Sequence, residues 1–81
     1  MTRDIAPRIV ADPAVCHGAP CIRGTRVMVS VLLDCLADGM THDQIVAEFQ
    51  GLTDDDIAAA LAYAARVMQS DEEYALEAQA G

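Results

Sequence analysis

The sequence predicts a mainly α-helical domain: a three-helix core of helix-turn-helix-like character, preceded by a short N-terminal β element. Thr41 and Thr53 each stand where a helix N-cap belongs, with a Gln or Asp three positions later. Aromatic residues make up only 4% of the chain, so the core must be built from aliphatic side chains and alanine. Turn residues and β-prone runs gather in the first third. Residues 1–81 are therefore expected to form one domain.

The segment 1–29 predicts the β element. Arg8–Ala11 is a short β-prone run that ends at Asp12-Pro13, and Cys21–Val29 is a second run, softened by Gly24. Two short strands are not stable as an isolated pair and need cover from helices or from a second subunit. Because an 81-residue chain also buries a modest core, we expect a homodimer.

The segment 30–68 predicts three helices, and the first of them runs from Ser30 to Asp38. Ser30 is its expected N-cap. Gly39 follows at the position where a left-handed residue often ends a helix.

The second and third helices are predicted to begin with the same N-terminal capping arrangement. Thr41 and Gln44 have the spacing of a capping box, and Thr53 and Asp56 repeat it. Apolar residues on either side of each cap are expected to form hydrophobic staples. These pairs are Met40 with Ile45 and Leu52 with Ile57; the inward stripe of the third helix continues through Leu61, Ala64 and Met68.

Residues 69–81 are predicted to be either an acidic tail or an extension of the third helix. An aromatic residue and a leucine stand there among carboxylates and have no place in a three-helix interior. We expect this segment to contact a protein partner through a few buried side chains. The candidate contacts are Asp71, Glu72, Glu73, Tyr74, Leu76 and Glu77.

The net charge of −8 is unevenly distributed. Residues 1–26 hold four arginines against two aspartates, a local +2, whereas residues 27–81 hold one arginine against 11 carboxylates, a local −10. Since phosphate neutralisation dominates affinity for DNA, any DNA contact must come from the first segment. The candidate DNA contacts are Arg3, Arg8 and Arg23.

The second and third helices resemble a helix-turn-helix, in which the start of the second helix approaches base edges. Here that start is Asp54-Asp55-Asp56, which would meet phosphates with negative charge. These aspartates are accounted for by capping and by the helix dipole. The sequence therefore predicts weak or conditional DNA binding.

Catalytic and metal-binding patterns are weak. Cys16, His17 and Cys21 lie close together, but a structural zinc site needs four ligands and no second pair follows. A Cys–His nucleophile would need a third group to orient the base, and none is evident. We therefore expect no enzymatic activity, no cofactor and no metal.

The odd number of cysteines suits a reducing compartment better than a disulfide framework. The longest unbroken apolar stretch, which ends at Ala65, is far shorter than the roughly 20 residues of a membrane span. The N-terminus has no apolar core of a signal peptide. We expect a cytoplasmic protein that does not enter a membrane.

The run C-H-G-A-P-C-I-R-G-T-R, residues 16–26, resembles the G-x-P-x-I-x-G-T-R signature of domain-of-unknown-function family 433. The helix pattern up to Tyr63 is also similar to that family. The resemblance transfers Gly24, Thr25 and Arg26 as motif positions of unproven role. We expect Arg26 to be structural, pairing with Asp12 or Asp34.

The resemblance also implies a function. Members of this family are commonly regarded as VapB-type antitoxins, which neutralise a PIN-like ribonuclease toxin encoded beside them. The leading hypothesis is therefore an antitoxin that binds a PIN-like toxin, with operator DNA binding as an additional role. The alternatives are a DNA-binding transcriptional regulator without a toxin partner and a structural oligomeric module.

Overall fold

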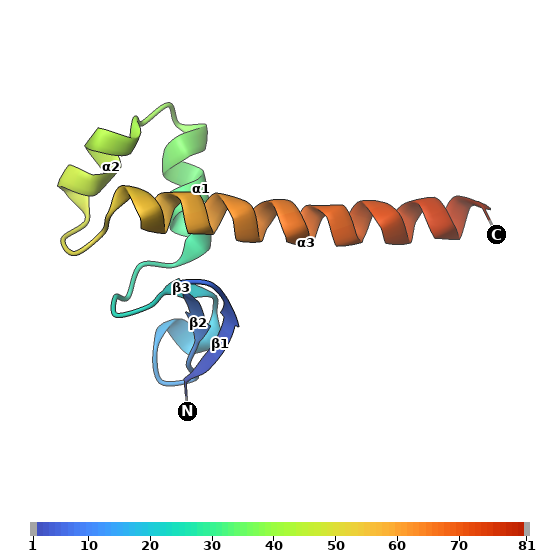
Figure 1. Cartoon of the computed structure of the whole chain (residues 1–81), viewed down its shortest axis with the longest axis horizontal. Helices are drawn as coiled ribbons and strands as arrows, with labels where there is room; N and C mark the ends of the chain where they lie inside the picture. Colours follow the sequence, from blue (N-terminus) through green and yellow to red (C-terminus); the bar gives the residue numbers. More distant parts are fainter. Residues whose placement is uncertain (1, 81) are drawn as a thin grey trace.

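The computed structural model describes the backbone of residues 2–80 and the side chains of residues 2–70. It consists of a small antiparallel sheet followed by three helices (Figure 1). In chain order the elements are β1 (Arg3–Ala6), β2 (Ile9–Ala11), the short 3₁₀ turn η1 (Cys16–Gly18), β3 (Cys21–Ile22), α1 (Val29–Ala37), α2 (His42–Glu48) and α3 (Asp54–Ala80).

The sheet has three strands in the order β1-β2-β3, one more than the sequence predicts. β2 is the central strand, and its Val10 pairs with Asp4 on one side and with Cys21 on the other. The segment of β1 has no β-prone character of its own, so it becomes a strand only because β2 offers a free edge. The predicted run to Val29 is cut to a two-residue strand, because the chain turns after Ile22.

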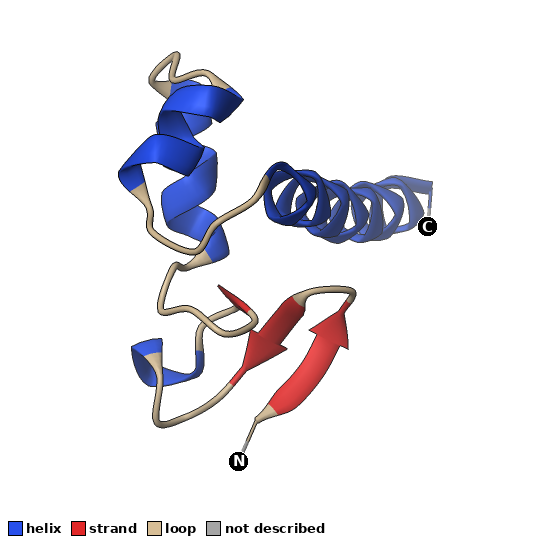
Figure 2. Ribbon diagram, turned by 60° about the vertical axis from the view of Figure 1, so that its left-hand side comes forward, coloured by secondary structure: helices blue, strands red, loops and turns tan. Residues whose placement is uncertain are grey.

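The core joins the sheet to the helices. Ile9 and Ile22 from the sheet are fully buried, as are Leu32, Ile45 and Ile57 from the three helices. All of these belong to one aliphatic cluster, which agrees with the scarcity of aromatic residues. Figure 2 shows the sheet and the α1–α2 pair on different sides of the first turns of α3, so this cluster lies where all three meet.

The two threonine caps are confirmed. Thr41 Oγ1 accepts from the Gln44 amide at 3.1 Å, and Gln44 Oε1 accepts from the Thr41 amide at 2.8 Å. Thr53 and Asp56 make the same reciprocal exchange at 3.3 and 3.0 Å. Both helices therefore begin where local hydrogen bonds satisfy amides that would otherwise lack partners.

The predicted cap of the first helix is wrong. α1 begins at Val29, and the capping position belongs to Met28, whose side chain makes no cap hydrogen bond. Instead the Val29 amide donates to the Pro20 carbonyl at 2.9 Å, a contact with the preceding loop that replaces a capping side chain. The other end agrees with the prediction, since Gly39 has a φ of +91°.

α3 is 27 residues long and extends beyond the other elements (Figure 1). Its backbone remains helical through residues 69–80, which is the helix-extension alternative for that segment. Among the described residues, no helix combines the length and apolar character that a membrane crossing requires.

Candidate functional site

The motif residues Gly24, Thr25 and Arg26 lie in the loop between β3 and α1. The Thr25 amide donates to the Ile22 carbonyl at 3.1 Å, and Gly24, third in this turn, has a φ of +79° as a type II turn requires. The Thr25 hydroxyl donates to the same carbonyl at 2.8 Å and accepts from the Val27 amide at 3.0 Å. Glycine and threonine in this motif therefore shape the loop.

Arg26 is exposed, and the predicted pairing with Asp12 or Asp34 is wrong. Within residues 2–70, no ion pair or side-chain hydrogen bond holds its guanidinium. Its carbonyl does accept a hydrogen bond from the Cys16 thiol at 3.3 Å. Because Thr25 already fixes the loop, the Arg26 side chain is not needed for its shape. It stands between two surface hollows of about 530 and 570 Å³ that the motif residues share.

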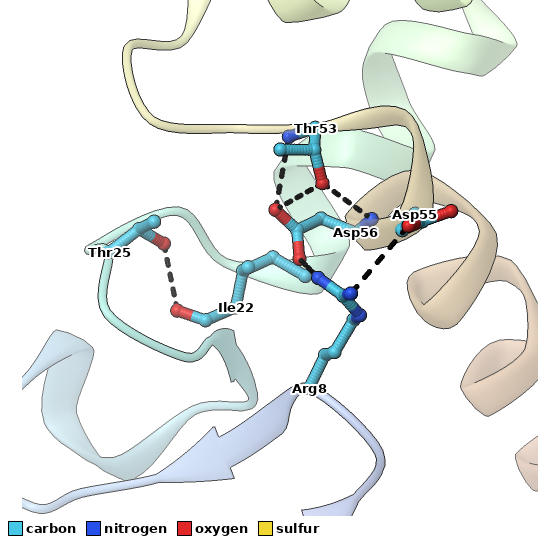
Figure 3. A network of polar contacts seen from close by, with 6 residues as sticks. All are labelled: Arg8, Ile22, Thr25, Thr53, Asp55 and Asp56. Carbon is cyan, nitrogen blue, oxygen red and sulfur yellow. Dashed lines mark hydrogen bonds and ion pairs between the residues drawn. The ribbon is translucent and has the colours of Figure 1, made fainter.

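Arg8 connects the sheet to the start of α3 (Figure 3). Its guanidinium donates to Asp56 Oδ1 at 3.0 Å and lies 3.7 Å from the exposed Asp55 carboxylate. The backbone of Arg8 has a φ of +66°, which is unusual for a residue with a side chain, and its carbonyl accepts from the Arg23 amide at 2.8 Å. Two contacts therefore hold the turn between β1 and β2: the hydrogen bond to the Arg8 carbonyl and the ion pair of the Arg8 side chain.

Asp56 is a buried carboxylate with a complete set of partners. Its side chain is only 9% exposed. Burial raises the pKa of Asp56, but hydrogen bonds from Arg8 and from the amide and hydroxyl of Thr53 outweigh burial and hold it below the usual 3.8. Asp56 is therefore ionised at neutral pH, and sequence reasoning missed its tie to Arg8 because the two residues are far apart in the chain.

The three arginines expected to contact DNA have different surroundings. Arg8 is paired with Asp56, and Arg23 Nη2 lies 2.7 Å from Asp4 Oδ1 in an exposed ion pair. Arg3 is an exposed residue of β1, and no described side chain forms an ion pair with it. Two of the three positive charges are therefore offset by the protein's own carboxylates.

An apolar groove of about 280 Å³ lies between α1 and α3. Met68 is 56% exposed at one end, and Val67 is 43% exposed beside it. The sequence predicts both Met68 and Leu61 in the core, but Leu61 is 41% exposed although the adjacent Ala60 is fully buried, so Leu61 faces away from the covered side of α3. The groove is lined by Pro20, Val29, Ser30, Leu33, Tyr63, Ala64, Val67 and Met68.

The candidate partner contacts in the last segment, Asp71, Glu72, Glu73, Tyr74, Leu76 and Glu77, lie outside the residues whose side chains are described. Their backbone belongs to α3. Within the described part of the chain, no cluster of His, Cys, Asp or Glu has an arrangement suited to a metal ion.

A family model described as "Protein of unknown function (DUF433)" matches residues 9–64, which is more than half of the chain. The chain belongs to this family. The match includes the motif loop, the Thr53–Asp56 cap and the Tyr63–Ala64 wall of the groove, whereas Val67 and Met68 lie beyond it. The family resemblance read from residues 16–26 is thereby confirmed.

A solved structure gives the same assignment. The chain is similar to a DUF433 member protein from Anabaena variabilis ATCC 29413, with 35% sequence identity and a TM-score of 0.70. The alignment covers 84% of this chain and 68% of that chain. No curated protein matches the sequence.

Proposed function

We propose that this protein is an antitoxin, which binds and neutralises a PIN-like ribonuclease. The observation that carries the proposal is the apolar groove between α1 and α3, whose exposed end is formed by Val67 and Met68. Apolar side chains gathered at one exposed place on a small protein are typical of a surface that binds another macromolecule. A groove between two helices suits an amphipathic helix of a partner.

Charge favours a basic partner at this groove. The segment 27–81 carries a local charge of −10, from one arginine against 11 carboxylates. α3 forms one wall of the groove and continues into the part of the helix that contains four of these carboxylates. A ribonuclease must present a basic surface to RNA, so it is electrostatically complementary to this helix. Such complementarity raises the association rate and discriminates against acidic partners.

The proposed function includes a helix-turn-helix-like arrangement of α2 and α3, and with it a limited role in DNA binding. In such an arrangement the first turn of α3 would face DNA. That turn presents the exposed carboxylates of Asp54 and Asp55, while Asp56 is buried against Arg8. We therefore propose operator binding only as a conditional activity of a homodimer or of the complex with the toxin.

The test uses two matched substitutions on α3, each of which introduces a positive charge. Val67 and Leu61 are 43% and 41% exposed, but only Val67 lines the groove. The full chain is co-expressed with a PIN-like ribonuclease, and growth rescue, co-purification and affinity are measured. We expect Val67→Arg to lose at least about tenfold in affinity, since an unpaired charge would be placed in an apolar contact. Leu61→Arg should rescue growth like the parent protein.

Two results would reject this proposal. If Val67→Arg and Leu61→Arg both neutralise the nuclease fully, the groove is not the binding surface. If Val67→Arg instead converts a dimer into a monomer, as measured by light scattering, while nuclease binding persists, the groove is a contact between copies of this chain. Thermal unfolding of both variants shows whether either substitution has disrupted the fold.

A further inference from the structure

The thiols of Cys16 and Cys21 lie together between the η1 turn and the motif loop. Cys21 Sγ donates to the Ala19 carbonyl at 3.3 Å, so its sulfur folds back over the turn that begins at Cys16. Cys16 Sγ donates across to the Arg26 carbonyl at 3.3 Å. Residue 28 of the same loop pairs with Cys21 in an isolated β-bridge, and the Cys16 and Cys21 thiols are in side-chain hydrogen-bonding contact.

The backbone that carries Cys16 is strained. Cys16 and His17 have φ values of +53° and +57°, and Gly18 follows at +84°. Residues with side chains seldom adopt this region, and strain of this kind clusters at functional positions. These residues lie in the connection between β2 and β3. The observed result of this conformation is that the Cys16 side chain points toward the motif loop and toward Cys21.

We infer that Cys16 and Cys21 form a reversible intramolecular disulfide, a modification site beside the motif loop. Both cysteines are free thiols in the structure. Cys16 is partly exposed and can meet a soluble oxidant, whereas Cys21 is only 2% exposed. The third thiol, Cys35, lies in α1.

The chemistry assigns different roles to the two thiols. Burial, together with the neighbouring Cys16 thiol, raises the pKa of Cys21 to about 11, so Cys21 is a poor first nucleophile at neutral pH. The Cys16 thiolate attacks a low-molecular-weight disulfide such as oxidised glutathione, which forms a mixed disulfide and releases one thiol. Cys21 then loses its proton and attacks Cys16 Sγ, which releases the second thiol. The protein loses two hydrogens, and the small disulfide is reduced to two thiols.

The disulfide has a direct consequence for the loop. Cys16 Sγ can no longer donate to the Arg26 carbonyl, because its hydrogen is gone, and Cys21 Sγ can no longer donate to Ala19. The turn around Gly24 and Thr25 keeps its own hydrogen bonds. Val27 also stays held, because its carbonyl accepts from the Ile22 amide and its amide donates to Thr25 Oγ1. Oxidation therefore removes only the thiol contact with the Arg26 carbonyl and leaves the loop in place.

Tryptic peptides separate the cysteines cleanly, because the chain contains arginine but no lysine. Cleavage after Arg8 and Arg23 gives one peptide, residues 9–23, that contains both Cys16 and Cys21, while Cys35 lies in residues 27–66. The full folded chain is equilibrated with defined ratios of reduced and oxidised glutathione, alkylated and digested. Mass spectrometry should find peptide 9–23 lighter by two hydrogens than its reduced form.

The native fold should favour formation of this disulfide. The test compares disulfide formation in the native chain with that in the urea-unfolded chain. We expect the native chain to form the disulfide at a ratio of oxidised to reduced glutathione at least about tenfold lower, because the fold holds the two thiols together. Cys21→Ser should accumulate glutathione on Cys16, because the second thiol is missing. Cys16→Ser should leave Cys21 unmodified in the folded protein, and Cys35→Ser, the matched control, should form the disulfide normally.

Three results would overturn the inference. One is a native chain that forms the disulfide no more readily than the unfolded chain. Another is a native chain that keeps glutathione on Cys16 although Cys21 is present. A third is a crosslink between peptides 9–23 and 27–66, which would show that Cys35 is the true partner.

Discussion

The first turns of α3 and the turns around Met68 belong to one helix, but they are held in opposite ways. Ile57 and Ala60 are fully buried, and Asp56 is tied to both Thr53 and Arg8. Ten residues further on, Val67 and Met68 expose about half of their apolar surface. A single helix is thus anchored by buried side chains in its first turns and exposes apolar side chains further along, and the two regions should respond differently to substitution.

The largest difference in the free energy of unfolding is expected between the variants Ile57→Ala and Met68→Ala. Ile57 is fully buried, so truncation removes packed methyl groups and leaves a cavity, which should lower the free energy of unfolding by about 3 kcal/mol. Met68→Ala removes a side chain that is 56% exposed and should change the free energy by less than about 0.5 kcal/mol. Urea unfolding followed by far-ultraviolet circular dichroism measures both. Equal losses would show that something covers Met68.

A smaller contrast is expected between two adjacent carboxylates. Asp56→Ala removes half of the Thr53 capping box and the partner of Arg8, and should cost about 2 kcal/mol. The cost is limited because the Arg8 side chain is 50% exposed and water replaces part of the lost contact. Asp55→Ala should stay within about 0.5 kcal/mol, since the Asp55 side chain is 83% exposed. If the two variants are equally stable, Arg8 does not join the sheet to α3.

The smallest effect is the dependence of stability on pH. The pKa of Asp56 is lowered in the folded chain, so its contribution is fully present above the unfolded value of 3.8 and is lost as the pH falls through the lower folded value. Asp56→Asn should therefore lose less stability than the parent protein between about pH 5 and about pH 2. The pKa of Asp12 is also lowered, by the Ala14 amide and the Thr2 hydroxyl, but Asp12 is present in both proteins and cancels in the comparison. Parallel stability curves would contradict this assignment.

The sequence predicted what depends on near neighbours. The starts of α2 and α3 could be placed, because Thr41 and Thr53 exchange hydrogen bonds with residues three positions later. Gly39 could be placed for the same reason, since a left-handed residue after a helix is a local requirement. The aliphatic character of the core followed from composition alone.

The errors concern contacts between distant segments. β1 depends on pairing with β2, and α1 begins at Val29 because of a hydrogen bond to Pro20. Local charge gave no sign that Arg8 pairs with Asp56 in another element, and its contact with DNA stays a prediction. Periodicity predicts Leu61 and Met68 in the core, but it identifies an apolar face and not which part of that face other elements cover.

The contact between Arg8 and Asp56 also bears on the order in which the chain folds. Its residues are separated by 48 positions, whereas each threonine cap spans three. Closing a long loop carries an entropic penalty that short-range contacts avoid, and chains rich in local contacts fold faster. The α2–α3 hairpin should accordingly form in the transition state, with the sheet docking onto it afterwards. In kinetic terms, the Arg8 contact would then limit how fast the protein unfolds and contribute little to how fast it folds.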